Sequence, residues 1–475
     1  MSVLWGGAEL VEALGGRPVG QIPTEIGGIS IDSRSLRPGD AFFAIRGEAH
    51  DGHDFATAAV KAGAAVLVIS EGKLPALGRL TAPLIVVPDV LAALERAGAA
   101  ARVRCRARII AITGSAGKTS TKDALRHALS SVGKVHASDK SFNNHWGVPL
   151  TLARMPADCD YAVFEIGMNH AGEIRPLSKL VRPHVAVVTL IAAAHLGHFS
   201  SLDDIARAKA EIFEGVEPGG VALINRDDPR SGELARMAKA AGVGTVCGFG
   251  EHPRATFRLT NLALHPDHSL ISASLGGQEV TARIGVPGRH VVQNALAVLG
   301  AAALAGADVE AVAGSLASLT AEPGRGKRHV LRHPEGEITL IDESYNANPA
   351  SMQAAIELLD ATPVPEGGRR IAVLGDMLEL GGHSSRLHAA LAELITGTRT
   401  DLILLAGPQM KSLNEALPGN LDRQYREDVD DLQQVLISEV RAGDVVMIKS
   451  SKGIGFSKLV DALIRQFPAG AGKDT

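Results

Sequence analysis

The segment Arg108–Thr121, with the sequence RIIAITGSAGKTST, restricts the possible folds of this chain more than any other stretch. It predicts a buried strand that leads directly into a glycine-rich turn and then into a helix. Backbone N–H groups of a turn containing Gly114 and Gly117 can bind phosphate oxygens, and the positive end of the helix strengthens that attraction. Lys118 adds a mobile cation. We therefore predict a phosphate-binding loop.

This loop is a short variant of the general pattern, which places a glycine where the chain has Ile112. A chance glycine-rich turn is the alternative explanation, but a strand before the loop and a helix after it disfavour that explanation. The hydroxyl of Thr119 is the group that such loops place on a magnesium ion. We expect a nucleotide to be bound by Thr113, Gly114, Ser115, Ala116, Gly117, Lys118, Thr119 and Ser120.

Length and composition predict several α/β domains. The chain has 475 residues, of which 45% are hydrophobic but only 3% aromatic. A length prior of about 150 residues per domain suggests three domains. Thin alanine-rich helices suit parallel sheets better than an all-β sandwich. We place the domains at residues 1–88, 89–324 and 325–475.

The apolar runs predict a different α/β arrangement in each domain. In the first domain, short strand-like runs alternate with loops rich in glycine, aspartate and histidine. The second alternates strands with helices, as parallel sheets do, and adds a small antiparallel patch between Gly248 and Val286. The third has buried strands at helix-sized intervals, which predicts an open parallel sheet of the dinucleotide-binding type. Ligands of such sheets bind at the carboxyl ends of the strands.

Charge, cysteine content and the N-terminal sequence argue against several classes of protein. Lys+Arg number 48 and Asp+Glu 52, a net charge of −4, so there is no basic field for nucleic acid. The cysteines lack C-x-x-C spacing, and we expect neither a disulfide framework nor a thiolate metal site. The first residues lack a basic leader, and no apolar stretch reaches the ~20 residues that span a bilayer. We expect a cytoplasmic protein without membrane insertion.

Three further residues are candidates for catalysis, although each has an ordinary structural explanation. Glu165 follows three buried residues of a strand and could hold magnesium or be a solvated strand-end carboxylate. His195 follows another strand, where a lone histidine is usually a hydrogen-bonded structural residue. Lys209 lies in a helix with acidic neighbours, where a surface ion pair contributes little. Their order after the phosphate-binding loop favours a catalytic role for the three residues together.

The chain resembles the Mur ligases, the ATP-dependent enzymes that form amide bonds in peptidoglycan synthesis. The resemblance runs through all three predicted domains, and unrelated chains would rarely assemble its motifs in this order. The matching segments are TGSAGKT (Thr113–Thr119), SFNNHWGVPLTL (Ser141–Leu152), EIGMNHAGEI (Glu165–Ile174), AHLGHF (Ala194–Phe199), AKAEIF (Ala208–Phe213), NRDD (Asn225–Asp228), GRHVVQNA (Gly288–Ala295), PGR (Pro323–Arg325) and DESYNANP (Asp342–Pro349).

Within that family, three regions are similar to the ligase that adds D-alanyl-D-alanine to UDP-N-acetylmuramoyl-tripeptide. They are motifs within Asp32–Phe55, YNANPASM (Tyr345–Met352) and LGDMLELG (Leu374–Gly381). The resemblance implies ATP and Mg²⁺ as cofactors. ATP would phosphorylate the terminal carboxylate of the tripeptide, and the dipeptide amine would attack the acyl phosphate. No covalent nucleophile on the enzyme is needed, and we predict no Ser–His or Cys–His arrangement that would supply one.

The resemblance also assigns one ligand to each domain, and other functions stay open. The first domain would bind the UDP precursor, the second ATP and the third the incoming dipeptide. One alternative is another ligase of the superfamily, either MurE, whose D-N-P-R motif is absent, or an enzyme like folylpolyglutamate synthase. A different class is a nucleotide-gated scaffold that forms no bond. The sequence leaves open whether the third residue of the tripeptide is diaminopimelate or lysine. It also leaves open the oligomeric state, and a monomer would be compatible with the sequence.

The resemblance implies roles for the candidate catalytic residues. Thr119 and Glu165 would hold the magnesium ion between the β- and γ-phosphates, and His195 a second ion. The lysine that matches Lys209 is typically carbamoylated in this family, so it would help to hold the second ion through water. Carbamoylation requires a buried, neutral amine, and we therefore predict that Lys209 is buried. The residues expected in catalysis are Lys118, Lys209, His195 and Arg325.

The other implied contacts surround ATP and the two substrates. Asn294 would bind adenine and Asp342 ribose, and Arg325 would bind ATP and lower the electrostatic barrier to phosphoryl transfer. Without the resemblance, Asn294 is better explained as a polar residue near a helix N-terminus. Asn143 or Asn144 would face the γ-phosphate. The residues expected to bind the substrates are Asp32, Ser33, Arg34, Gly47, His53, Asn143, Asn144, Tyr345, Asn346, Asn348, Asp376 and Lys449.

The chain departs from the family pattern at three places. Leu190 and Val291 stand where many members have asparagine, and KSSKG (Lys449–Gly453) replaces the usual KGS. The first two changes remove side chains that could hydrogen-bond around the metal and the nucleotide. The third changes the loop on the dipeptide side. None of them removes a residue that the implied mechanism needs.

Overall fold

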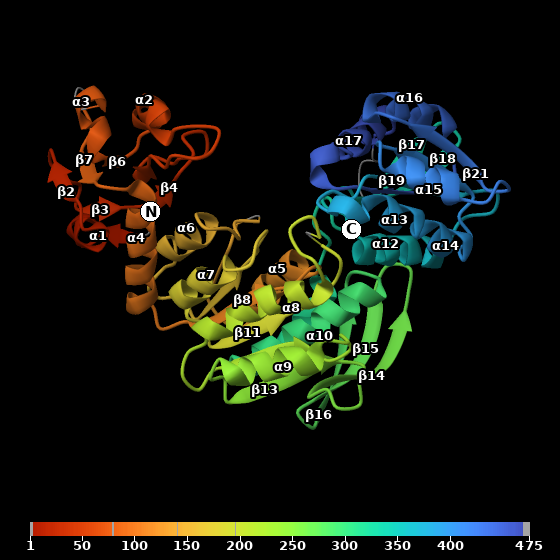
Figure 1. The fold of residues 1–475 in the computed structure, drawn as a ribbon, viewed down its shortest axis with the longest axis horizontal. Helices are drawn as coiled ribbons and strands as arrows, with labels where there is room; N and C mark the ends of the chain where they lie inside the picture. Colours follow the sequence, from red (N-terminus) through yellow and green to blue (C-terminus); the bar gives the residue numbers. More distant parts are fainter. Residues whose placement is uncertain (1–2, 78–79, 140, 195, 469–475) are drawn as a thin grey trace.

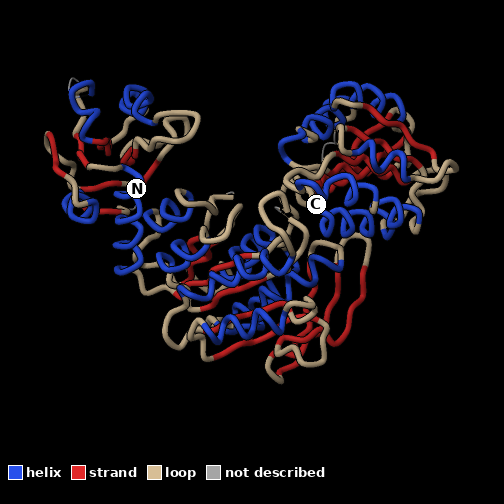
Figure 2. Tube along the Cα trace, viewed as in Figure 1, coloured by secondary structure: helices blue, strands red, loops and turns tan. Residues whose placement is uncertain are grey.

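Three α/β domains follow one another along the chain in the computed structural model, which describes residues 3–77, 80–139, 141–194 and 196–468. The first domain (red to orange in Figure 1) and the third (cyan to blue) stand at opposite ends of the central domain. In Figure 2 helices lie along both sides of the strands of the third domain. Each domain has its own sheet, so the predicted α/β class is confirmed.

The first domain is built on a five-stranded sheet with the order β2-β7-β6-β5-β4. The pairings β4–β5, β5–β6 and β6–β7 are parallel, and their apolar side chains are buried on both faces. The elements are β1 (Trp5–Gly6), α1 (Gly7–Leu14), β2 (Arg17–Val19), β3 (Glu25–Ile26), β4 (Gly28–Ser30), β5 (Asp40–Phe43), η1 (Gly52–Phe55), α2 (Ala56–Lys61), β6 (Val66–Ser70), η2 (Glu71–Lys73), α3 (Leu74–Leu77) and β7 (Leu84–Val87).

Helix α4 (Val90–Arg104) joins the first domain to the central one. It begins after Asp89, whose carboxylate accepts a hydrogen bond from the Ala92 N–H at 2.7 Å and so caps the helix. Ala97 packs in the same apolar core as the first sheet and as Leu150 of α6 (Gly147–Ala153). The helix therefore contacts both domains, and the domain boundary at residue 88 stays a prediction, as does the one at 324.

The central domain is a nine-stranded sheet with the order β16-β15-β14-β13-β12-β11-β8-β10-β9. Strands β9 to β14 are parallel, whereas β14, β15 and β16 form the expected antiparallel patch. The elements besides α6 are β8 (Arg108–Thr113), α5 (Lys118–Leu129), β9 (Val135–Ala137), β10 (Tyr161–Glu165), α7 (Ile174–Val181), β11 (Val185–Val188), α8 (Leu202–Ala210), η3 (Glu211–Gly215), β12 (Val221–Asn225), α9 (Ser231–Ala240), β13 (Thr245–Gly250), β14 (Phe257–Leu264), β15 (Ser269–Leu275), β16 (Gln278–Ile284), α10 (Arg289–Leu304), α11 (Val309–Ser315) and η4 (Leu316–Ser318).

The third domain is a six-stranded sheet with the order β17-β18-β22-β19-β20-β21. All neighbours are parallel except the β17–β18 hairpin. The elements are β17 (Lys327–His333), β18 (Gly336–Glu343), α12 (Pro349–Ala361), β19 (Arg370–Gly375), η5 (Gly381–His383), α13 (Ser384–Ala389), α14 (Leu391–Thr396), β20 (Leu402–Ala406), α15 (Met410–Ala416), β21 (Asp422–Arg426), α16 (Val429–Glu439), β22 (Val445–Lys449), η6 (Lys452–Ile454) and α17 (Ser457–Gln466).

The structure adds two facts to the expectations about membranes and cysteines. In the part of the chain that it describes, no helix combines the length and the apolar character of a membrane span. The Cys105 and Cys159 thiols are free and buried, with their Sγ atoms 3.4 Å apart. Burial raises the pKa of the Cys159 thiol. Spacing along the chain did not predict this proximity. Cys105 and Cys159 precede β8 and β10, and the sequence alone does not show that these two strands are parallel neighbours.

Candidate active site

The glycine-rich loop connects β8 to α5 and has the form that the sequence predicted. Gly114 and Gly117 have φ of 153° and 82°, values that favour glycine. A Cβ atom on Gly114 would lie 1.9 Å from the Thr189 hydroxyl, and one on Gly117 would lie 2.5 Å from the Asn294 amide oxygen. The loop backbone therefore lies so close to two neighbouring side chains that only glycine fits at these two positions.

Thr189 is a support of this loop that we did not predict. Its hydroxyl donates a hydrogen bond to the Ala116 carbonyl at 2.6 Å, and the Ser115 N–H donates to the Leu190 carbonyl at 2.7 Å. The segment Thr189–Leu190 follows β11, the parallel neighbour of β8. Position at the end of an adjacent parallel strand was the signal that could have identified it.

Two lysine amines are enclosed near the loop. The Lys118 amine donates to the Gly114 carbonyl at 2.7 Å, and burial lowers its pKa. Lys209, on α8, is only 1% exposed, so the predicted burial is confirmed and the surface ion pair is wrong. Burial, followed by repulsion from Lys118, lowers the pKa of Lys209 well below its usual value. Within the described residues its amine makes no hydrogen bond, which favours a neutral group.

Glu165 ends β10 as a buried carboxylate with one free oxygen. The residue is 1% exposed, and its Oε1 atom accepts a hydrogen bond from the Asn143 side chain at 2.8 Å. Its Oε2 atom is buried without a partner, as are the hydroxyls of Thr113 and Ser115. Unpaired buried oxygens are costly unless a ligand satisfies them. The solvated strand-end explanation for Glu165 is therefore wrong.

These oxygen donors fit a magnesium ion. Thr119 is buried at the start of α5 and Glu165 has an unpaired oxygen, and Mg²⁺ prefers hard oxygen ligands. Among the described residues no group of three or more His, Cys, Asp or Glu side chains could hold a metal by itself. Protein ligands of Mg²⁺ are commonly few, with phosphates and water completing the shell. His195, expected at a second ion, lies outside the described residues.

Asn143 and Asn144 have different roles in the structure. Asn143 donates to Glu165, and a Cβ atom on Gly167 would lie 2.9 Å from its side chain. The Asn144 side chain instead accepts the Gly147 N–H at 3.0 Å and so begins α6. Of this pair, Asn143 lies beside the candidate metal ligand. A γ-phosphate contact of either residue stays a prediction.

A pocket of about 60 Å³ lies beside α5 and α10 and includes Asn294, Ser120 and Arg325 in its lining. Asn294 faces the glycine-rich loop through the close approach of its amide oxygen to Gly117. His290, from the first turn of α10, also lines this pocket, and burial lowers its pKa. Asn294 and Arg325, both expected at ATP, thus line one pocket, and the adenine contact of Asn294 stays a prediction.

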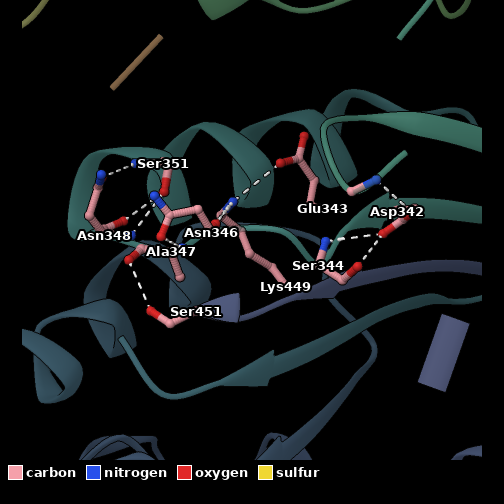
Figure 3. Close-up of polar contacts among 10 residues, drawn as sticks. Asp342, Glu343, Ser344, Asn346, Ala347, Asn348, Ser351, Lys449 and Ser451 are labelled. Carbon is pink, nitrogen blue, oxygen red and sulfur yellow. Dashed lines mark hydrogen bonds and ion pairs between the residues drawn. The ribbon is translucent and has the colours of Figure 1, made fainter. Parts of the chain in front are cut away.

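Asp342, the expected ribose ligand, holds the link between the central and third domains. Its Oδ2 atom accepts the Gly324 N–H at 2.7 Å, and its Oδ1 atom accepts the Ser344 N–H and hydroxyl at 3.1 and 2.6 Å. The contacts with Ser344 are drawn in Figure 3. Both carboxylate oxygens therefore bind the protein itself in this arrangement, and a ribose contact stays a prediction.

Asn346, Asn348 and Lys449 belong to a hydrogen-bonded network at the ends of β18 and β22 (Figure 3). The Lys449 amine, 2% exposed, donates to Glu343 at 3.2 Å and to the Asn346 carbonyl at 2.9 Å. Asn348 caps α12 by accepting the Ser351 N–H at 2.9 Å. Lys449 and Asn348 thus support the loop. Asn346 is exposed, and its amide oxygen accepts the Ala347 N–H at 2.9 Å.

Two contacts connect this loop to the central domain. The Asn348 side chain donates to the carbonyl of Ser115 at 3.4 Å. The hydroxyl of Tyr345 lies 2.7 Å from the Ser141 hydroxyl. The third domain therefore reaches both the glycine-rich loop and the segment that carries Asn143.

Asp376, expected to bind the dipeptide, caps a helix instead. Its carboxylate accepts the Gln409 and Met410 N–H groups at 3.2 and 2.9 Å, at the start of α15. Burial raises the pKa of Asp376, while the two backbone hydrogen bonds lower it in part. In this arrangement the side chain faces backbone rather than an open site.

A cleft of about 1800 Å³ separates the first domain from the central one. Its lining includes Asp32, Ser33, Arg34, Gly47, Asn143 and Asn144, which the sequence analysis named. It also includes residues that the sequence analysis did not name as ligands, among them Arg46, Phe142, Trp146, His170 and Glu173. The cleft opens toward Asn143, beside Glu165, so a ligand in it could extend to the candidate metal site.

His53 lies behind the wall of this cleft and is 6% exposed. Its Nδ1 atom is 2.6 Å from Asp51 Oδ1, and its Nε2 atom accepts the Ser70 N–H at 3.0 Å, with the Ser70 hydroxyl at 3.1 Å. A Ser–His contact is therefore present, but this contact alone does not make the nucleophilic arrangement that the sequence analysis argued against. Because Nε2 already accepts the Ser70 backbone N–H, it is poorly placed to remove the hydroxyl proton, and the arrangement is a support rather than a nucleophile.

Comparison with known families agrees with this geometry in all three domains. The Mur ligase middle domain matches residues 112–302, the glutamate ligase domain residues 327–452, and the Mur ligase family catalytic domain residues 25–102.

The chain belongs to the Mur ligase family.

Individual relatives cover nearly the whole of this Mur ligase. It is 33% identical over 459 residues to the UDP-N-acetylmuramoyl-tripeptide--D-alanyl-D-alanine ligase of Escherichia coli, covering 96% of this chain and 97% of that protein. The enzyme of the same name from Rickettsia prowazekii is 32% identical, and the match covers 91% of this chain and 94% of that protein. A crystal structure of MurF from Acinetobacter baumannii has a TM-score of 0.84 and 31% identity, covering 97% and 99% of the two chains.

The expected site residues of this Mur ligase fall into three groups. Those of the glycine-rich loop lie together with Glu165, Lys209 and Asn294. Those of the cleft line one cavity, except His53, which supports it. In the third domain, the side chains of Asp342, Asn348, Asp376 and Lys449 are engaged in holding protein segments.

One more supporting residue was missed. Asp228, 2% exposed, accepts the Ile191 N–H at 2.7 Å and thereby holds the segment that leads toward His195. The sequence analysis quoted the NRDD motif of the Mur ligases without giving Asp228 a role. Its position at the end of β12, beside β11, was the available signal.

Proposed function

We propose that this Mur ligase is an ATP-dependent, ADP-forming ligase that joins D-alanyl-D-alanine to UDP-N-acetylmuramoyl-tripeptide. The observation that carries the proposal is the position of the 1800 Å³ cleft, which opens toward Asn143 and the buried, half-satisfied Glu165 beside the glycine-rich loop. A precursor bound there by its UDP end would extend its peptide toward the γ-phosphate. Relatives of this name that match over more than 90% of the chain support the same substrates.

The first chemical step brings two anions together. An oxygen of the peptide carboxylate forms a bond to the γ-phosphorus, and the bond to the β-phosphate oxygen breaks, which leaves ADP and an acyl phosphate. The barrier is largely electrostatic, and cations placed in advance lower it. Lys118 and the guanidinium of Arg325 are the protein cations of this site. Magnesium bound at Thr119 and Glu165 would neutralise phosphate charge.

The second step forms the amide bond. The neutral amine of D-alanyl-D-alanine attacks the acyl carbon, the tetrahedral adduct collapses, and phosphate leaves as the amine loses a proton. An acyl phosphate hydrolyses if water reaches it, so the site must be covered during this step. The third domain, which contacts the central one through Tyr345 and Asn348, is the element that can cover it.

We also propose that Lys209 is carbamoylated. A neutral amine adds to carbon dioxide and releases one proton, which gives an anionic N-carboxylate. The burial of Lys209, its lowered pKa and its lack of a hydrogen-bond partner among the described residues support that reaction. The product would replace a buried amine near Lys118 with an anion, which reverses the repulsion between these two residues.

A cytoplasmic location stays part of the proposal. The paired but unbonded thiols of Cys105 and Cys159 fit a reducing compartment.

Release of ADP from ATP tests the proposed reaction. The chain is incubated with UDP-N-acetylmuramoyl-tripeptide and either D-alanyl-D-alanine or single amino acids, with tripeptides that carry diaminopimelate or lysine. We expect release only with the dipeptide. Glu165→Gln, which keeps the size of the side chain, is expected to lose roughly 100-fold or more in kcat.

Other results would replace the proposal. Release with a free diamino acid and the shorter UDP precursor would indicate MurE activity. Release with folate and glutamate would indicate the other alternative ligase. ATP binding without release under any of these conditions would indicate a scaffold.

A further inference from the structure

Tyr345 lies where three segments of the site meet. The Arg325 guanidinium is centred 4.3 Å from the centre of its ring, and the Lys452 amine 5.1 Å from it. Its hydroxyl is 2.7 Å from that of Ser141 in the central domain. A single side chain therefore contacts the link between domains, the third domain and the central domain. Aromatic faces attract cations at such distances.

The guanidinium of Arg325 has no other fixed partner. Within the described residues it makes no hydrogen bond and no ion pair, although its side chain is partly buried. Its positive charge contributes to the lowered pKa of Lys118, so it lies within the electrostatic field of the glycine-rich loop. Five N–H donors are thus available to anionic oxygens near that loop.

The backbone around Arg325 is held on both sides. The Gly324 N–H donates to Asp342 at 2.7 Å, and the Gly326 N–H donates to the Asp342 carbonyl at 2.8 Å. The Tyr345 N–H donates to the Gly324 carbonyl at 3.1 Å. Because the backbone is anchored, the direction of the Arg325 side chain depends mainly on what its guanidinium contacts, and that contact is the ring.

We propose that Tyr345 is a positioning residue that directs the Arg325 guanidinium toward the γ-phosphate. The hydroxyl contact with Ser141 makes this direction depend on the docked third domain, so that Arg325 is correctly placed only when the site is covered. The inference rests on the proposed function and deepens it. It also replaces the expected role of Tyr345 in binding substrate directly.

A double-mutant cycle tests the proposal. Tyr345→Leu removes the ring and is expected to lower kcat about 2- to 30-fold, the range of a cation–π contact. In the Arg325→Ala background the same change should alter kcat by less than about 2-fold, because the ring has nothing left to direct. The KM for the dipeptide should stay unchanged in both cases.

Conservative variants separate the hydroxyl from the ring. Tyr345→Phe keeps the ring, and Ser141→Ala removes its central-domain partner; each is expected to lower kcat about 2- to 10-fold. The double variant with both substitutions should lose no more kcat than either single variant. Thermal unfolding shows whether each variant is folded, and Tyr345→Phe and Ser141→Ala keep the test usable if Tyr345→Leu is not.

Two results would overturn the proposal. One is a kcat loss of Tyr345→Leu that multiplies with that of Arg325→Ala. The other is a raised KM for the dipeptide with unchanged kcat, which would return Tyr345 to direct substrate binding. Failure of the proposed function looks different, since the unmodified chain would then release no ADP with the dipeptide.

Discussion

Burial of the Lys209 amine costs stability at every pH at which the amine is protonated in the unfolded chain. Its pKa in the folded chain lies well below the ordinary value of 10.5. Between those two pH values the unfolded chain binds one more proton than the folded chain, so unfolding is favoured as pH falls through this window. The penalty is lost when pH rises above the ordinary value. Burial of Lys209 therefore lowers stability, whereas the proposed carbamate chemistry requires that burial.

Lys209→Met should stabilise the protein at pH 7.5 in buffer depleted of carbon dioxide. Replacing a buried ion pair by apolar side chains gains roughly 1 to 4 kcal/mol, and we expect a gain of that order for this unpaired amine. Urea unfolding at several pH values measures the difference, which we expect to shrink as pH approaches 10.5. An equal gain at every pH would mean that the Lys209 amine is not the source of the penalty.

Lys209→Ala should lower turnover about 10- to 100-fold, as loss of an outer-shell metal partner does. Added formate or acetate should restore part of the rate, because a small carboxylate can occupy the place of the carbamate. Lys209→Met, whose longer side chain fills that space, serves as the control that such anions should not rescue. Parent turnover in Lys209→Ala without added carboxylate would contradict the carbamate.

Individual residues were predictable where chemistry requires one residue type at a fixed position. Lys118 and Glu165 follow strands that the apolar pattern reveals. Thr189 and Asp228 were missed because their roles depend on which strands are neighbours, and that order is not visible along the chain. Asp376 was expected at a ligand because it follows a strand, but the start of α15 lies beside it and takes both of its oxygens.

At the scale of elements, the loop of residues 46–52 forms one wall of the cleft and is held from behind. Asp51 bonds to His53 on one side and lies 2.8 Å from the Lys73 amine on the other. These contacts lower the pKa of Asp51, against the effect of burial. His53 in turn is anchored to Ser70 at the end of β6. The wall of the cleft therefore depends on side chains that do not face it.

His53→Ala should raise the KM for the UDP precursor about 10-fold and leave the KM for ATP unchanged, since a lost buried hydrogen bond costs about 1.4 kcal/mol. Ser70→Ala is the matched control. It removes the hydroxyl but keeps the backbone N–H that donates to Nε2, and its effect should stay below about 2-fold. Steady-state kinetics with each substrate varied measures both.

The opposite pattern would contradict this role. If Ser70→Ala abolished turnover while His53→Ala left precursor binding intact, the Ser–His arrangement would be chemical rather than structural.

Elements were predictable in the middle of each sheet and less so at its edges. The apolar runs located β5, β6, β8, β10, β11, β19, β20 and β22. Strand β13, inside the central sheet, was missed, and the edge strands β4 and β16 were located. The other missed strands of these three sheets are β2, β9, β17 and β21, and each lies at an edge of its sheet, where one side is open to solvent. Their residues are mostly half-buried or exposed, so they lack the continuous apolar run that marks a central strand.

At the scale of the whole molecule, the sites belong to different domains. The cleft lies between the first and central domains, the glycine-rich loop in the central one, and the Tyr345 loop in the third. Amide-bond formation needs the three ligands in contact and shielded from water. The domains must therefore approach one another during the reaction.

Small-angle scattering should show this approach. We expect the radius of gyration to fall when both a non-hydrolysable ATP analogue and the UDP precursor are present, and to fall less with either alone. Glu165→Gln, with a weakened metal site, should need more analogue for the same change. An unchanged radius with both ligands would contradict domain closure.

The most direct measurement is the fate of ¹⁸O in the tripeptide carboxylate. The labelled UDP precursor is incubated with ATP, D-alanyl-D-alanine and the chain, and the inorganic phosphate formed is analysed by mass. If the glycine-rich loop presents the γ-phosphate to the carboxylate, one carboxylate oxygen passes through the acyl phosphate, and each phosphate carries one ¹⁸O. Phosphate without ¹⁸O, formed together with the amide product, would contradict activation of the carboxylate by ATP.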